Sequence, residues 1–266
     1  MTTALGPLST LALVAVLSAC SPARVHADVA ADGVLAAPTL LPAGTVAASV
    51  TLDATLDGER ADLAPDLWYG VSDRLTLGIA HSQPPLGMFR ANRGVCISGC
   101  LPADGRYGGV ALSAQFPLTR VDPASPERTR VVGIAATDVA TWSPAAVSLA
   151  LGAVAEWHAD RFWAQAGPRL SIGLLGRAGG NRERASAGVT MGAQIVGPLA
   201  IEIGIGVGGP ATVDFFAGAE TPVRARVVLR PGANVAAGIA IGASDLLGDG
   251  ARRSYAALTV EVRIAT

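Results

Sequence analysis

The 266-residue sequence is poor in charge, in aromatic side chains and in lysine. Charged residues make up 15% of it, against about 25% in an average globular domain, and aromatic residues make up 5%. The apolar half of the chain is therefore mostly Ala, Val, Leu and Ile, and its mean hydropathy of +0.43 is high for a soluble protein. The 20 basic residues are all Arg, which indicates a GC-rich genome. A net charge of −1 lacks the basic excess of nucleic-acid binders, so no nucleic-acid partner is expected.

The N-terminus has the pattern of an export signal. The apolar stretch 11–19 is too short for a transmembrane helix and is typical of a signal peptide. Cleavage after Ala27 is expected, and a lipobox-like sequence that ends at Cys20 offers lipidation of that cysteine as the alternative. The sequence thus predicts a signal peptide over 1–27, a flexible periplasmic lead over 28–44 and a β-domain over 45–266.

Cysteine is scarce, and its placement agrees with export. The chain has three Cys residues, and removal or lipidation of Cys20 leaves Cys96 and Cys100 as a pair. An oxidising compartment favours a disulfide between them. A metal site would need two further ligands, and His81 is the one candidate nearby, so no metal is expected.

From Thr45 onward, apolar residues alternate with small or polar ones, which is the period of a β-strand. In 199–207, for example, Leu, Ile and Val alternate with Ala, Glu and Gly. Twelve segments show this pattern, each close to the roughly 9 to 11 residues that a tilted transmembrane strand needs. They are 45–55, 63–71, 75–82, 106–116, 129–138, 147–157, 162–172, 185–195, 199–207, 222–230, 234–242 and 254–264.

The region 187–208 also permits a different interpretation. Its one charge is Glu202, so a hydropathy window would accept it as a transmembrane helix. Pro198, frequent glycines and the alternation after Leu199 instead favour a hairpin with a turn at 196–198.

The links between the segments differ in length in a regular way. Short links at 72–74, 158–161, 196–198 and 231–233 alternate with long links at 83–105, 173–184, 208–221 and 243–253. Outer-membrane barrels show this alternation, with the short turns in the periplasm. The long link 117–127 breaks the rule. The phase predicts both ends of the domain on the periplasmic side.

The two faces of the strands decide between membrane and water. The face opposite the apolar one is mostly Gly, Ala, Ser and Thr, too bland for a solvated sheet surface. We therefore predict an all-β, transmembrane, antiparallel up-and-down barrel of about twelve strands. Few aromatic residues are available for interfacial girdles, and the last residue, Thr266, is not aromatic; both facts count against this prediction. The residues predicted to line the lumen are Asp53, Glu156, Gln165, Arg169, Gln194, Glu202, Arg224, Arg226, Glu261 and Arg263.

One hairpin carries a family resemblance. The stretch 68–78 reads Trp-Tyr-Gly-Val-Ser-Asp-Arg-Leu-Thr-Leu-Gly, with a Tyr-Gly-small-Asp-Arg turn between two strands. It resembles the strand–turn–strand hairpin of Gram-negative outer-membrane β-barrel proteins, including transporters similar to the meta-pathway phenol-degradation family. The resemblance covers about eleven residues, implies the barrel architecture and says nothing of a substrate.

Residues for catalysis are sparse. His81 next to Ser82 suggests a lipid hydrolase, but neighbouring residues of a strand point to opposite faces, so the nucleophile would have to come from another strand, such as Ser113 or Ser171. The glycines of 204–209 precede no helical pattern and do not form a phosphate loop. No enzyme activity, cofactor or metal is expected.

Four hypotheses follow for an exported barrel in contact with outer-membrane lipid. The preferred one is a passive channel or transporter-like barrel for small solutes. The others are a non-conducting structural or adhesive barrel that binds a partner through its outer loops, a lipid-anchored periplasmic β-protein, and a lipid hydrolase. The loop 83–105 either folds into the lumen or remains outside as a binding loop.

Overall fold

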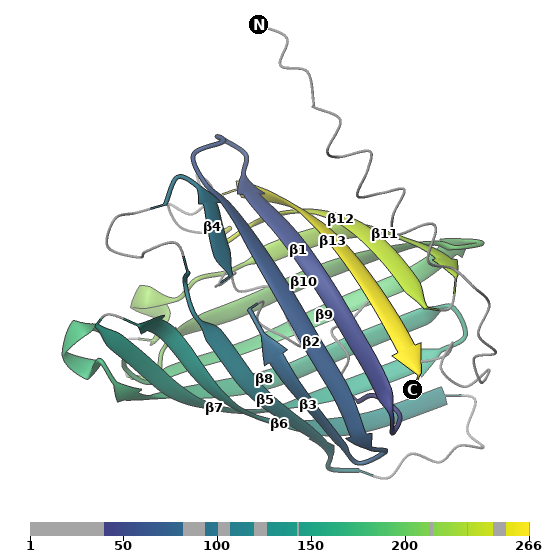
Figure 1. The fold of residues 1–266 in the computed structure, drawn as a ribbon, viewed down its shortest axis with the longest axis horizontal. Coiled ribbons are helices and arrows are strands. Elements are labelled where there is room, and N and C mark those ends of the chain that lie inside the picture. Colours follow the sequence, from purple (N-terminus) through teal and green to yellow (C-terminus); the bar gives the residue numbers. More distant parts are fainter. Residues whose placement is uncertain are drawn as a thin grey trace, which may run out of the picture. The chain divides into compact units, whose positions relative to one another are not determined.

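A computed structural model describes residues 40–81, 94–100, 107–119, 127–142, 144–212, 215–232, 234–246 and 254–265. The sequence-based boundaries at residues 27 and 28, and Cys20, lie outside these ranges. Within them the chain forms one antiparallel sheet that closes on itself, because β1 (Thr45–Thr55) pairs with both β13 (Ser254–Ala265) and β2 (Ala61–Ser72). Figure 1 shows the resulting barrel, with the first and last strands side by side. The predicted all-β barrel is confirmed.

The remaining strands follow in chain order around the wall, except that β3 pairs directly with β5 and β4 lies beside β2. They are β3 (Leu75–Ala80), β4 (Val95–Ser98), β5 (Val110–Pro117), β6 (Glu127–Trp142), β7 (Ala145–Ala159), β8 (Phe162–Leu175), β9 (Arg184–Val196), β10 (Leu199–Pro210), β11 (Val223–Gly232) and β12 (Val235–Ala243). Short 3₁₀ helices at Arg177–Gly179 and Phe215–Gly218 lie in two of the links. Twelve strands make the closed ring, and β4 is an additional short strand paired with β2.

The two ends of the barrel are built from different links. At one end, which we call the tight-turn end, two residues each separate β2 from β3, β7 from β8, β9 from β10 and β11 from β12. Both ends of the barrel chain, Thr45 and Ala265, pair with one another there. Longer links lie mostly at the other end, the long-loop end. Among the described residues, no helix has the length and hydropathy to cross a membrane.

Three details differ from the sequence-based expectation. β6 ends at Trp142 and β7 begins at Ala145, so the link between them at the long-loop end has two residues rather than the expected eight. The run of alanines there gives little contrast between the two faces, which hides the alternation. The fourth predicted segment starts later, at Val110, and Tyr107 before it makes an isolated bridge to Val95 of β4. β4 itself was not predicted.

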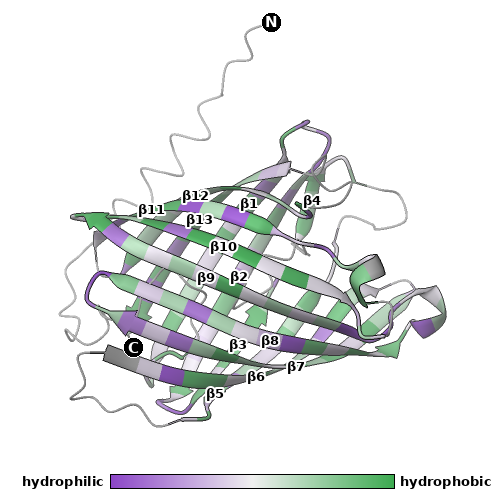
Figure 2. Ribbon diagram, turned by 180° about the vertical axis from the view of Figure 1, so that it is seen from behind, coloured by the Kyte–Doolittle hydropathy of each residue, from purple (hydrophilic) through white to green (hydrophobic). Residues whose placement is uncertain are grey.

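Side-chain exposure follows the period of two. In β2, Asp62, Ala64, Asp66 and Trp68 are buried while the residues between them are half-buried or exposed. Large apolar side chains such as Ile203 on β10 and Ile239 on β12 are more than half exposed on the outer face. Figure 2 shows hydrophobic and hydrophilic residues alternating along the strands. The barrel is thus apolar outside and mixed polar inside, the reverse of a soluble protein.

Aromatic rings cover glycines on neighbouring strands. Trp68 pairs with Gly78, and a Cβ added at Gly78 would lie 2.1 Å from the Trp68 ring. Trp163 and Gly192 form a second such pair between β8 and β9. The glycine leaves room for the ring, and the ring replaces the packing that the glycine lacks.

This packing predicts the cost of filling one glycine. Gly78→Ala forces the Trp68 ring aside and should destabilise the barrel by about 1–3 kcal/mol, the usual cost of overpacking. Urea unfolding of the refolded protein, followed by the loss of the heat-modifiable band, measures the change. Gly232→Ala is the control, because a Cβ there meets nothing within 4 Å. Equal stability of the two variants would contradict the packing.

Candidate functional site

A row of inward residues crosses four neighbouring strands toward the tight-turn end. Glu202 on β10 pairs with Gly192 on one side and with Arg226 on the other, and Gly192 also pairs with Trp163. We call Trp163, Gly192, Glu202 and Arg226 the Glu202 row. Arg226 Nη1 lies 3.6 Å from Glu202 Oε2, and the two side chains are 12% and 1% exposed. Small residues of β12 leave room for Arg226, since a Cβ at Gly238 would lie 2.5 Å from its Nε.

Several buried polar atoms of this region have no hydrogen-bond partner among the described residues. They are both carboxylate oxygens of Glu202, Nε1 of Trp163, and Nε and Nη2 of Arg230. Buried polar atoms are normally satisfied by the protein or by bound water. On β13, which β12 separates from β11, Arg263 Nε donates to Glu261 Oε1 at 2.8 Å, and both residues are buried.

A second row crosses β6, β7 and β8 at a similar level. Arg130 pairs with Glu156, and Glu156 pairs with Gln165. The Arg130 guanidinium donates to Glu156 Oε2, while Gln165 Nε2 donates to Glu156 Oε1 at 2.7 Å. This carboxylate therefore has partners on both adjacent strands.

Acidic residues face inward nearer the long-loop end. Asp53 and Asp62 lie directly opposite one another on β1 and β2, both buried. Arg60 Nε donates to Asp62 Oδ2 at 2.8 Å. Asp138 on β6 is buried at the same end, and Asp66 lies about midway along β2. Like charges directly across a ladder destabilise a sheet, and the Arg60 guanidinium offsets this repulsion at Asp62.

The predicted lumen residues occupy different surroundings. Buried on the inner face are Asp53, Glu156, Gln165, Glu202, Glu261 and Arg263. Half-buried are Arg169, Arg224 and Arg226. Gln194 shares the face of its partner Ala200, but it lies at the tight-turn end, is exposed and donates to the carbonyl of Gly197.

Sequence reasoning missed five inward charges. They are Asp62, Asp66, Arg130, Asp138 and Arg230. Each is in phase with an inward residue two positions away, so the period of two was sufficient to find them. Asp62 was missed for a further reason, because the second strand begins at Ala61 rather than at residue 63.

His81 closes a break in the wall. The ladder between β2 and β3 reaches Leu67 and Ile79, and the ladder between β2 and β4 begins at Leu63. Between them, the backbone N–H of His81 donates to Asp66 Oδ1 at 2.6 Å, and its ring Nδ1 contacts the carbonyl of Pro65. Since that carbonyl can only accept, Nδ1 carries the proton, and Nε2 accepts from the Tyr107 hydroxyl at 2.7 Å.

These contacts leave no ring nitrogen of His81 for a serine. Ser82 lies outside the described residues, Ser113 is buried on β5 and Ser171 is half-buried on β8. Within the described part of the chain, no group of three His, Cys, Asp or Glu residues is placed to hold a metal ion.

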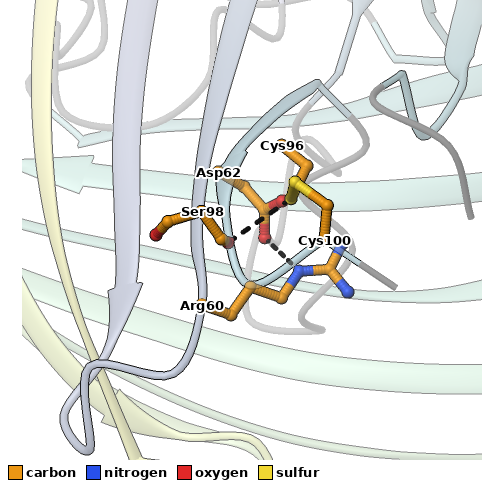
Figure 3. The surroundings of a disulfide bond; sticks show 5 residues. All are labelled: Arg60, Asp62, Cys96, Ser98 and Cys100. Atoms are coloured by element: carbon orange, nitrogen blue, oxygen red, sulfur yellow. Dashed lines mark hydrogen bonds and ion pairs between the residues drawn. A yellow bond between two sulfur atoms is a disulfide. The ribbon is translucent and has the colours of Figure 1, made fainter. Parts of the chain in front are cut away.

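The disulfide between Cys96 and Cys100 lies against the β1–β2 hairpin. Its S–S distance is 2.11 Å, and Figure 3 shows it beside the Arg60–Asp62 ion pair. Gly99 has φ +66°, and a Cβ there would lie 1.6 Å from the carbonyl oxygen of Glu59, so the small loop approaches the β1–β2 link closely. This described portion of the 83–105 loop is thus part of the wall; the rest lies outside the described residues.

An apolar groove of about 560 Å³ lies on the barrel wall and is lined mostly by outward side chains of β2, β3 and β5. Leu67, Leu77, Ile79 and Leu112 line it, each more than a third exposed. Its lining lacks the convergent charged groups that a catalytic site needs.

Comparison with known proteins identifies the fold. No protein-family model matches the chain, and no curated protein sequence matches it. Among solved structures, the NanC porin superposes with a TM-score of 0.56 at 7% identity, over 82% of this chain and 99% of that one. The KdgM porin, in complex with disordered oligogalacturonate, gives 0.49 at 6% identity, over 82% and 98%. A loop-deletion mutant of OmpT from Vibrio cholerae gives 0.40 at 8%, over 83% and 98%.

The chain is therefore a closed, twelve-stranded antiparallel barrel with the fold of an outer-membrane porin. Within that class it resembles the NanC porin in fold alone, since the sequences share 7% identity.

The Glu202 row predicts that removal of a buried charge lowers the stability of the barrel far more than removal of an exposed one. Glu202→Gln leaves the Arg226 guanidinium in a buried position without its carboxylate and should destabilise the barrel by about 3–5 kcal/mol. Urea unfolding measures this, and adding Arg226→Met should recover part of the loss.

The exposed pair Arg177–Glu183 at the long-loop end provides the control. Its hydrogen bond to Arg177 holds the pKa of Glu183 below its usual range, but both side chains are exposed and solvent screens them. Glu183→Gln should leave the unfolding midpoint nearly unchanged. If Glu202→Gln is equally harmless, the buried pair does not support the wall.

Proposed function

We propose that this protein is a passive channel for small polar solutes in the outer membrane of a Gram-negative bacterium. The observation that carries the proposal is the inside-out distribution of side chains on a closed barrel. Exposed Val, Leu and Ile cover the outer face, while charged and polar residues occupy the inner face. A bilayer accepts a sheet only when it is closed, because an open edge would leave backbone groups unpaired in hydrocarbon.

The inner ion pairs support an open bore rather than a plugged one. Arg226–Glu202 and Arg130–Glu156 each join adjacent strands, and Arg263–Glu261 lies within one strand. These pairs run along the wall instead of bridging the barrel.

The charges also suggest the preference of the channel. Asp53, Asp62 and Asp138 face inward toward the long-loop end, where Arg224 also faces inward and Arg60 pairs with Asp62. The inward residues Arg226, Arg230 and Arg263 lie nearer the tight-turn end, beside Glu202 and Glu261. In the outer-membrane barrels the long loops are extracellular. Among these residues the three carboxylates at the outer mouth outnumber the two guanidinium groups of Arg60 and Arg224, which favours cations and neutral polar solutes over anions.

Planar-bilayer recording tests both parts of this proposal. The refolded wild type should give discrete conductance steps, and its reversal potential in a salt gradient should indicate cation preference. The variant Asp53→Asn with Asp62→Asn should conduct with a reversal potential moved toward anion preference. Asp57→Asn, in the exposed β1–β2 link, is the matched control and should leave the potential unchanged. A heat-modifiable, folded barrel that never conducts would overturn the channel.

A non-conducting structural or adhesive barrel is the second candidate. The observation that favours it is the burial of inner polar side chains, with Gln115 and Thr76 fully buried and Glu156 1% exposed. In that case the long loops would bind the partner. The bilayer recording separates the two functions, since this candidate predicts silence from every variant.

The two remaining hypotheses have less support. A lipid-anchored periplasmic protein would expose the apolar outer face to water, at a cost that the belt of exposed Leu, Ile and Val makes large. Lipidation of Cys20 stays a prediction. A lipid hydrolase would need His81 as a base, and its ring is held by Pro65 and Tyr107.

A further inference from the structure

The chain turns sharply just before the first strand. Thr45 N–H donates to the carbonyl of Pro42 at 3.1 Å, and Gly44 has φ +73°. A positive φ at the third residue of a four-residue turn is the geometry of a type II turn, which favours glycine there. The turn reverses the direction of the chain, so residues 40–43 run antiparallel to the start of β1.

Residues 40–44 lie inside the barrel. Gly70 and Thr76, which they touch, belong to the inner face of β2 and β3, because Tyr69, Val71 and Leu77 between and beside them are exposed outward. A Cβ at Gly70 would lie 2.0 Å from the carbonyl oxygen of Pro42 and 2.9 Å from that of Leu41. The backbone of this segment thus rests on the inner surface at a position where only glycine leaves room.

Three hydrogen bonds hold the segment in place. Leu41 N–H donates to Thr76 Oγ1 at 2.8 Å, Ala43 N–H donates to Asp73 Oδ1 at 3.1 Å, and Gly44 N–H donates to the carbonyl of Gly70 at 2.8 Å. The acceptors come from β2, from β3 and from the tight turn between them. The segment is therefore bound by one hairpin, the same hairpin whose sequence resembles that of known outer-membrane proteins.

The Leu41 side chain anchors the segment. It is 2% exposed and packs with Ala47, Trp68, Ala80 and Ala111, which are all inward residues of β1, β2, β3 and β5. On an inner wall that faced only water, these clustered apolar groups would be left exposed to solvent. Leu41 fills a recess formed by three alanines and an indole ring.

We propose that residues 40–44 form an internal strap that narrows the bore at the tight-turn end of the barrel. The strap takes up space on the inner wall at the level of Gly70 and Thr76, where the proposed solute path leaves the barrel. The inference rests on the proposed channel function. It adds that the Leu41–Pro42 segment binds to a site on the β2–β3 hairpin of the same chain.

The variant Gly70→Ala tests the strap while residues 40–44 remain in the chain. The added methyl occupies the position of the Pro42 carbonyl and should displace the strap, while the β2–β3 ladder stays paired. Because conductance grows with the cross-section of the narrowest part of a pore, the variant should conduct at least about 1.5 times as well as the wild type. Gly232→Ala, whose Cβ meets no neighbour, is the control and should conduct like the wild type.

Thiol labelling reports on the strap independently of conduction. In a Cys20→Ser background, Leu41→Cys should react at least about tenfold more slowly than Ala43→Cys, since a buried group reacts only when its segment opens. Adding Gly70→Ala should remove this difference. Fast labelling of Leu41→Cys in the folded barrel would overturn the docked strap.

The combined results separate the two proposals. Conducting wild type and Gly70→Ala variants with equal conductance would overturn the strap as a constriction and leave the channel standing. A silent wild type with a conducting Gly70→Ala variant would support the strap as a closure. Silence from both would overturn the channel and the constriction together.

Discussion

Closure of the backbone ladder is the constraint on which this structure depends. Because β1 pairs with both β13 and β2, the wall has no free edge among the twelve ring strands. Closure divides the side chains into one set that faces the bore and one set that faces outward, and the strict period of a strand assigns each residue to one of them. The apolar surface, the inner rows of charge and the strap all follow from that division.

The interior is organised by residue size as much as by charge. Glycines at 78 and 192 receive the rings of Trp68 and Trp163, Gly238 makes room for Arg226, and Gly70 makes room for the strap. Glycine therefore does two things here: it lets long side chains lie flat along the wall, and it lets backbone approach backbone. The ion pairs Arg226–Glu202 and Arg130–Glu156 accordingly join adjacent strands along the wall.

Much of this architecture is predictable from the sequence, and the exceptions have physical causes. The alternation in 199–207 identifies the hairpin and the inward position of Glu202, because Ile and Gly differ so strongly. The alanine-rich stretch around 135–146 offers no such contrast, and there the predicted strands end too early. The strap and β4 have no period at all, since Leu41 and Cys96 are held by tertiary contacts with β2 and β3. Arg130 and Asp66 are in phase with inward neighbours, so the same period of two predicts their inward position.

The inside-out arrangement is tested most directly by the four tryptophans. Trp157 is exposed on the outer face and Trp142 is exposed at the end of β6, whereas Trp68 is buried inside and Trp163 lies on the inner face with it. Single-tryptophan variants refolded into vesicles of brominated lipid should show strong quenching for Trp157 and weak quenching for Trp68. Equal quenching of the two, or stronger quenching of Trp68, would contradict the assignment of faces and with it the account of this protein as a membrane barrel.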